Sequence, residues 1–163
     1  MIKYILLIII TLLLLTGCTS NSQKEKYKND LLKTHDLIQN NIKTCILASD
    51  LYSTVWRNAI EDRKDFNIEI NNVINESKRI GQYKVMDMSK EKIDNEMKQL
   101  SNPPKNYQRA HDKLVEMYGI YTQIYSLALN PSGSLVSYNN TINDLQNKLI
   151  KTSSEFKVLL PNN

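Results

Sequence analysis

The sequence contains few of the residues on which several common folds and sites depend. Its 163 residues include two cysteines, four glycines and four prolines. Two cysteines exclude a disulfide-rich scaffold, and so few glycines and prolines disfavour a β-sandwich or a Gly-rich phosphate-binding fold. The formal net charge of +4 is too small for a nucleic-acid binder with a dedicated basic face, so we expect no nucleic-acid partner.

Motifs for catalysis and metal binding are also lacking. The two histidines, His35 and His111, do not have the spacing of a zinc signature, and no Gly-x-Ser-x-Gly motif or phosphate loop occurs. His35 falls on an apolar helical face, where a satisfied core or boundary histidine is commoner than a ligand. Cys45 falls on the same face and suits the role of a small hydrophobe. We therefore expect no enzyme, catalytic residue, metal or cofactor; a site built across helices from both histidines and a carboxylate stays open.

The one long apolar run lies at the N-terminus. It covers residues 4–15 after Lys3 and ends in Leu15-Thr16-Gly17-Cys18. Twelve residues are short for a bilayer core of about 30 Å, and small residues before a cysteine resemble the bacterial lipobox. That resemblance implies cleavage between Gly17 and Cys18 once the Cys18 thiol has been diacylated. An ordinary signal peptide with a chance cysteine, or a short transmembrane anchor, is the alternative.

These features predict how the chain is processed and where in the cell the protein is located. Residues 1–17 form a signal peptide, residues 18–23 form a short lipidated tether, and residues 24–161 form the folded body. Two acyl chains on Cys18 provide durable attachment. We expect a protein anchored by lipid to the extracytoplasmic face of the cell membrane.

The rest of the chain has the periodicity of amphipathic helices. Apolar residues recur in steps of three and four, and no segment alternates with period two. A first helix is predicted from about residue 24 to residue 63. Its predicted core positions are Leu31, His35, Ile38, Ile42, Cys45, Ser49, Tyr52, Trp56 and Ala59.

Turn and cap residues divide the remainder. Asp65 can cap a segment over 66–100 that is either one helix broken near Gly81 or a short helix followed by a longer one. Asn102 suits an N-cap with Pro103 at the first helical position. The helix that starts there must stop by residue 130, because Pro131 disfavours the α conformation before it. Residues 132–134 then make a turn and cap a last helix.

The final two helices are predicted to be about 27 residues each and to form an antiparallel hairpin across a link of four to five residues. With the first helix and the 66–100 segment, the predicted fold class is all-α: an antiparallel bundle of four or five helices behind a lipoprotein signal peptide.

Several short motifs resemble a known group of proteins. The motifs are Trp56-Arg57-Asn58-Ala59-Ile60, Ser101-Asn102-Pro103-Pro104, Asn130-Pro131-Ser132-Gly133-Ser134-Leu135 and Leu159-Leu160-Pro161. Together they are similar to those of small, mostly uncharacterised helical proteins and lipoproteins of Gram-positive Firmicutes. The resemblance covers about residues 52–161 and implies a helical hairpin at the surface of a single-membrane bacterium. It implies no activity.

Tyrosines are the main candidates for a surface that binds a partner. Tyr118 and Tyr125 lie seven residues apart, one step to the side of the predicted core face of their helix. Such a flank is either a packing seam for a neighbouring helix or a partly exposed strip that binds a partner, for which tyrosine is well suited. We therefore expect a protein-binding module, of prophage or mobile-element origin in one version. The alternative is a structural or accessory subunit of a membrane complex.

Overall fold

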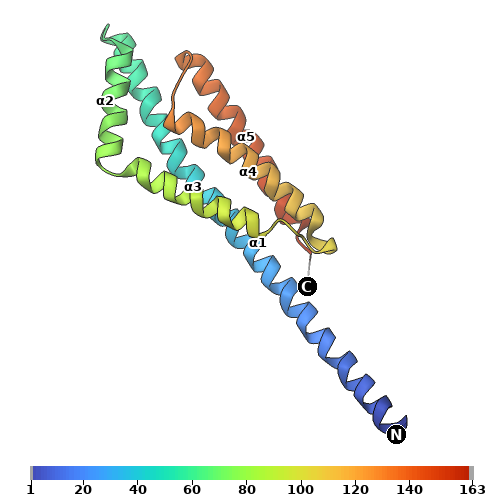
Figure 1. Ribbon diagram of the computed structural model, residues 1–163. Coiled ribbons are helices and arrows are strands. Elements are labelled where there is room, and N and C mark those ends of the chain that lie inside the picture. The colour runs from blue at the N-terminus through green and yellow to red at the C-terminus, as the bar shows by residue number, and fades with distance from the viewer. Residues whose placement is uncertain (1, 162–163) are drawn as a thin grey trace.

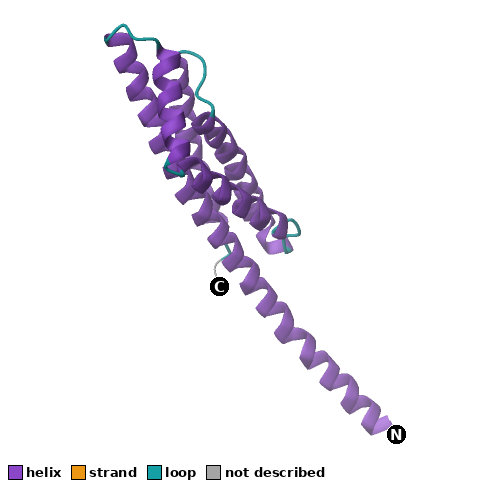
Figure 2. Cartoon of the chain, turned by 60° about the vertical axis from the view of Figure 1, so that its left-hand side comes forward, coloured by secondary structure: helices purple, strands orange, loops and turns teal. Residues whose placement is uncertain are grey.

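The computed structural model describes the backbone of residues 2–161 and the side chains of residues 22–161. Within residues 2–161 the chain forms five α-helices, one short 3-10 helix and no strand, which confirms the all-α prediction (Figures 1 and 2). The helices are α1 (Ile2–Glu61), α2 (Phe66–Arg79), α3 (Gln82–Gln99), η1 (Lys105–Tyr107), α4 (Gln108–Leu129) and α5 (Leu135–Leu159).

Helix α1 extends well past the other helices at its N-terminal end (Figure 1). Gly17 and Cys18, the predicted cleavage and lipidation site, come before residue 22, where the described side chains begin. Among the described residues, no helix has the length and apolar character needed to cross a membrane.

The core face of α1 agrees with the predicted one. All nine predicted core positions are buried, from Leu31 to Ala59. Thr34, Asn41 and Ala48 are buried as well, and the periodicity did not single them out. The reason is that α1 contacts each of the other four α-helices, so a broader side of it is covered than one stripe predicts.

Residues 66–100 form two helices rather than one broken helix. Asp65 caps α2 as predicted, because its carboxylate accepts hydrogen bonds from the backbone N–H groups of Asn67 and Ile68. Gly81 separates α2 from α3 with a φ of 81°, a left-handed conformation that favours glycine. Ile80 is exposed because it stands at the end of α2 just before this turn.

The predicted start of the next helix is wrong. Asn102 caps no helix, and Pro103 is not helical; the first turn is η1, and α4 begins only at Gln108. The physical reason is the second proline. Because Pro103 precedes Pro104, its own α conformation is disfavoured, and Pro104 is itself extended with a ψ of 144°.

The turn between α4 and α5 follows the prediction closely. Ser134 and Ser137 form a reciprocal capping box at the start of α5, and Gly133 has a φ of 94°. Helix α4 has 22 residues, fewer than predicted, because η1 replaces its first turn, and α5 has 25. They pack side by side with one face of each in the core. The buried residues of the two are Ala110, Leu114, Met117, Ile120, Tyr121, Ile124 and Ala128, and Tyr138, Ile142, Leu145, Leu149, Thr152, Ser153 and Phe156.

Candidate functional site

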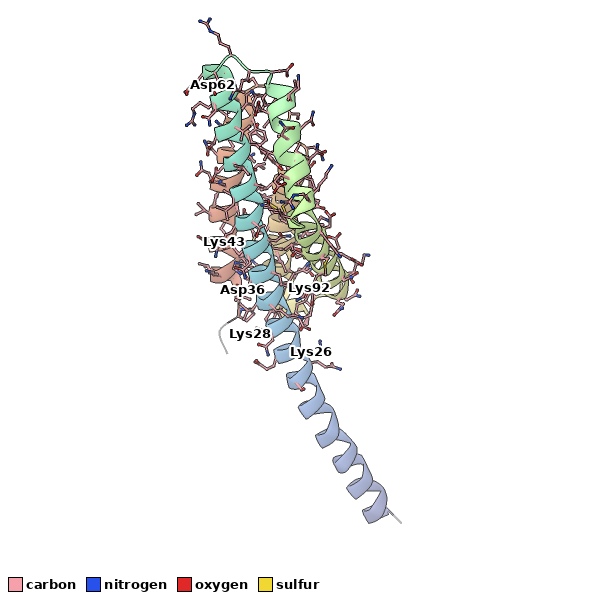
Figure 3. All side chains as sticks on the ribbon, turned by 90° about the vertical axis from the view of Figure 1, so that its left-hand side faces the viewer. Lys26, Lys28, Asp36, Lys43, Asp62 and Lys92 are labelled. Atoms are coloured by element: carbon pink, nitrogen blue, oxygen red, sulfur yellow. The ribbon has the colours of Figure 1, made fainter. Side chains whose placement is uncertain are left out.

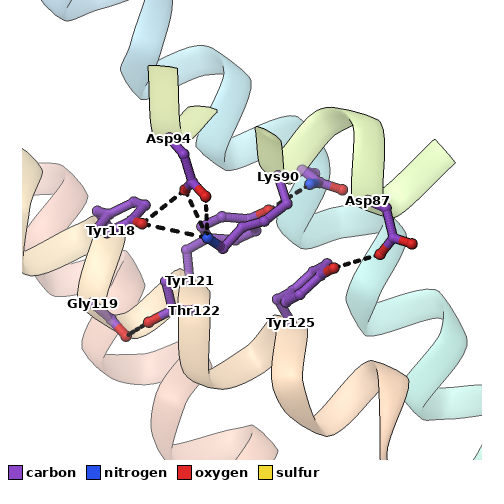
Figure 4. A network of polar contacts seen from close by, with 9 residues as sticks. Asp87, Lys90, Asp94, Tyr118, Gly119, Tyr121, Thr122 and Tyr125 are labelled. Carbon is purple, nitrogen blue, oxygen red and sulfur yellow. Dashed lines mark hydrogen bonds and ion pairs between the residues drawn. The ribbon is translucent and has the colours of Figure 1, made fainter. Parts of the chain in front are cut away.

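The two candidate recognition tyrosines lie against α3. The hydroxyl of Tyr118 donates a hydrogen bond to Oδ1 of Asp94 at 2.7 Å, and the hydroxyl of Tyr125 donates one to Oδ1 of Asp87 (Figure 4). Both side chains are half-buried. Tyr118 and Tyr125 therefore lie in a packing seam between α3 and α4, the first of the two alternatives.

A lysine of α3 completes this network. The Nζ atom of Lys90 lies 2.7 Å from both carboxylate oxygens of Asp94 and 3.4 Å from the hydroxyl of Tyr118. It also lies over the rings of Tyr118 and Tyr125, at 5.3 and 5.9 Å from their centroids. Burial acts to lower the pKa of Lys90, but its bonds to Asp94 and Tyr118 raise that pKa above the usual value. The polar groups of this seam thus bind one another.

The thiol of Cys45 is unsuited to nucleophilic chemistry. Its side chain is fully buried, and burial raises its pKa to about 12. The thiol is therefore protonated at neutral pH, whereas the thiolate is the reactive form. This agrees with its predicted place in the core.

The seam between α1 and α5 is hollowed along much of its length. Three hollows follow one another along it. The first lies between residues 35–43 and 150–157, the second between 39–47 and 146–150, and the third between 49–57 and 139–143. Together they span about 22 residues of α1, or about 33 Å. We call this surface the α1–α5 groove.

The middle of the α1–α5 groove is apolar. Ile42, Ile46 and Leu149 form its floor, and Leu47 and Ile150 stand at its edges with exposed fractions of 68% and 65%. Its two ends are polar; at one of them Ser53 Oγ donates to Asn139 Oδ1 at 2.6 Å across the seam. An apolar centre between polar ends is the usual make-up of a protein-binding surface.

The other end of the α1–α5 groove contains His35, which is 3% exposed. Its Nε2 lies 2.9 Å from Oγ of Ser153 on α5, and its Nδ1 lies 2.9 Å from Oδ1 of Asp36. The ring is stacked on Phe156, with centroids 4.8 Å apart. His35 is thus a satisfied, buried histidine, as its position predicted. Ser153 was missed because it is 118 residues away in sequence and no local motif marks it.

His111 has a different environment. Its Nδ1 is buried without a hydrogen-bond partner, and Oδ1 of Asp112 lies 3.7 Å from it, too far for a hydrogen bond. Within the described residues, no three histidine, cysteine or carboxylate side chains are grouped so as to hold a metal ion. The structure therefore does not bring His35, His111 and a carboxylate together as a metal site.

No family model, curated protein or solved structure matches the chain. The likeness to small helical lipoproteins of Firmicutes stays a prediction.

Proposed function

We propose that the protein is a lipid-anchored, extracytoplasmic binding module that engages another envelope protein through the α1–α5 groove. The observation on which the binding role depends is the groove itself, with its exposed apolar centre. The anchor depends on the sequence Leu15-Thr16-Gly17-Cys18, and the mature chain begins at Cys18.

The distribution of charge supports attachment to a membrane at the end from which α1 extends. The hydroxyl of Tyr27 donates to the carbonyl of Leu100 at 2.8 Å, and its ring lies 5.7 Å from that of Tyr107. Lys113 and Glu155 form an ion pair at 2.6 Å. These contacts gather residues 24–30, 98–113 and 155–161 at one end of the molecule.

That end is basic. Its three segments have eight basic and four acidic residues, a net charge of +4, whereas the other residues after position 17 have twelve basic and thirteen acidic, a net of −1. In Figure 3, Lys26 and Lys28 lie at the end near the N-terminal part of α1, and Asp62 lies at the opposite end. A basic end facing the surface would be attracted to anionic lipid headgroups, which supports the proposed orientation.

The finer architecture belongs to this proposal. We infer that α1, α4 and α5, together with the α2–α3 pair, form an antiparallel bundle behind a signal peptide. The link of residues 130–134 between α4 and α5 supports this inference, because so short a connection favours antiparallel neighbours. The bundle would hold the groove at a constant distance from the anchor.

An amphipathic helix of the partner is the occupant that suits the groove. Its apolar residues, spaced by three and four, would lie over Leu47 and Ile150, as in other helix-in-groove complexes. At the end of the groove where Lys43 and Lys157 line the first hollow, an acidic residue of the partner would complement their charge. Tethering both proteins to one membrane raises their effective concentration, so a weak contact suffices.

The anchor is tested with the two cysteines as a matched pair. Cys18→Ala should abolish incorporation of a labelled fatty acid, and Cys45→Ala should leave it intact because Cys45 is buried in the folded body. Labelling that persists in Cys18→Ala would overturn the anchor while leaving the binding role open.

The binding site is tested by photo-crosslinking in intact cells. A crosslinking residue at position 47 or 150 should capture the same protein, and one at Ile68, which is 59% exposed on α2, should not. Leu47→Lys should remove the product obtained from position 150. Equal capture from position 68, or an unchanged product in Leu47→Lys, would argue against the groove. A chain that purifies only with a membrane partner would favour the accessory-subunit alternative.

A further inference from the structure

We propose that Ser153, with His35 as its general base, is a nucleophile that accepts acyl groups from small carboxylic esters in the first hollow of the α1–α5 groove. This proposal does not depend on lipid anchoring, but it places the reaction in the hollow whose Lys43 and Lys157 the proposed partner would also contact. It differs from the expectation of no enzyme, which rested on local motifs. Such motifs do not register residues brought together from α1 and α5.

The hydrogen bonds determine which nitrogen of His35 is protonated. An ionised Asp36 only accepts hydrogen bonds, so the Nδ1 that faces its Oδ1 at 2.9 Å is the N–H donor. In the neutral ring Nε2 is then the acceptor, and Ser153 donates its hydroxyl hydrogen to Nε2 across 2.9 Å. This is the arrangement in which a histidine removes a proton from serine.

The ring of His35 is also fixed in orientation. It is stacked on Phe156 with an angle of 8° between the planes, and Phe156 follows Ser153 by three residues on the same helix. Helix α5 therefore supplies both the nucleophile and the surface that orients its base. Asp36 is 73% exposed at its side chain, so its electrostatic contribution is screened by solvent and smaller than that of a buried carboxylate.

The first hollow lies beside this pair, whose residues are 3% (His35) and 8% (Ser153) exposed. Its volume is about 570 Å³, within the usual range for small-molecule sites, and His35, Asp36 and Ser153 all line it. Lys43 and Lys157 line it too. Ser153 lies inside α5, six residues before its last residue Leu159, so the backbone N–H groups around Ser153 already donate to carbonyl groups of the helix. We assign to these two ammonium groups the stabilisation of the negative charge that forms on the ester oxygen.

The reaction balances without a further reagent. The Oγ of Ser153 forms a bond to the carbonyl carbon as its proton passes to Nε2 of His35. The bond from that carbon to the alkoxy oxygen then breaks, and the same proton leaves with the alcohol. Water, deprotonated by Nε2, then attacks the acyl-serine and releases the carboxylic acid, with the proton returned to Ser153. Side-chain ammonium groups stabilise an oxyanion less well than aligned N–H groups, so we assign esters, not amides, as the substrate class.

Two probes test the proposal on the full-length chain. The first is hydrolysis of p-nitrophenyl acetate, and the second is covalent labelling by a fluorophosphonate, with the modified residue located by mass spectrometry. The native chain should give one adduct, on Ser153. Ser153→Ala should lose the adduct and about 100-fold in rate, because without the Ser153 hydroxyl His35 has no nucleophile to deprotonate and a positioned base contributes at least about 100-fold.

A neighbouring serine provides the control. Ser154 lines the same hollow but donates its hydroxyl to the carbonyl of Ile150, so Ser154→Ala should keep both the adduct and the rate. Asp36→Asn should fold normally, because Asp36 is exposed, and should reduce the rate. His35→Gln should lose the adduct; its melting temperature is measured alongside to exclude unfolding. Absence of an adduct, an adduct on a lysine, or equal rates for the native chain and Ser153→Ala would overturn the proposal.

Discussion

The hydroxyl of Tyr118 on α4 donates to Oδ1 of Asp94 on α3, and the same carboxylate is paired with Lys90. Asp94 therefore joins two helices and also neutralises a lysine whose side chain is only 20% exposed. A seam of this kind fixes which residues of α3 and α4 face each other, because leaving one of its polar groups unpaired costs free energy. The rings of Tyr118 and Tyr125 cover the core while their hydroxyls bind polar groups of α3. For this reason both residues lie one step to the side of the core face of α4.

Removal of Asp94 should be more costly than removal of an ordinary surface aspartate. Asp94→Ala leaves Lys90 without its carboxylate partner, and we expect a loss of about 1–3 kcal/mol in the free energy of unfolding. Asp144→Ala on the exposed side of α5 is the control and should change it by less than about 0.5 kcal/mol. Urea denaturation measures both. If the Lys90→Met/Asp94→Ala double variant is no more stable than Asp94→Ala, the loss does not come from the unpaired lysine.

The contribution of Tyr118 and Tyr125 to the free energy of unfolding can be divided between their rings and their hydroxyls. Replacing both Tyr118 and Tyr125 by serine removes two packed rings and should cost several kcal/mol of unfolding free energy. Replacing both by phenylalanine keeps the rings and removes only hydroxyl hydrogen bonds, at about 1 kcal/mol each. Thermal unfolding compared across the native chain and the two double variants gives the division. A serine pair as stable as the native chain would show that these rings are a free recognition strip.

Sequence periodicity predicted the main core stripe of α1, but not the additional buried residues Thr34, Asn41 and Ala48 or the contacts between helices. The nine predicted core positions of α1 are all buried because a helix that packs along its whole length must repeat its apolar residues every three to four positions. Pairs such as Asn41 with Tyr121, or His35 with Ser153, depend on how the helices are brought together. No spacing within one helix encodes those contacts.

The start of α4 shows a different limit. Asn102 followed by Pro103 is a good local helix start, and it would have been one without Pro104. The restriction that a proline places on its predecessor outweighed the N-cap preference, and the helix began five residues beyond Pro103.

Substitution of two glycines by alanine should change the free energy of unfolding in opposite directions. Gly119 lies within α4, and an added Cβ would contact nothing within 4 Å; Gly119→Ala should raise the free energy of unfolding by about 0.5–1 kcal/mol. Gly81 also has free space around it, but its φ of 81° strains any residue with a Cβ. Gly81→Ala should lower that free energy by about 1 kcal/mol. Equal shifts of the melting temperature in the same direction would refute this account of the α2–α3 corner.

Ionisation of Tyr138 should weaken the fold at high pH. Its side chain is 2% exposed, and burial raises its pKa from 10.0 to about 12. Because the folded-state pKa is the higher one, the folded protein binds more protons than the unfolded chain between those values. The contribution to stability is therefore complete below pH 10 and is lost as the pH rises through about 12. Within that window one such group contributes at most about 1.4 kcal/mol per pH unit to the slope.

Tyr138→Phe keeps the buried ring and removes the ionisable hydroxyl, so its free energy of unfolding should fall less steeply with pH than that of the native chain. Urea denaturation at a series of pH values measures the two slopes, with tyrosinate absorbance of the folded protein as an independent reading. Parallel slopes in the two proteins would show that Tyr138 ionises as readily folded as unfolded.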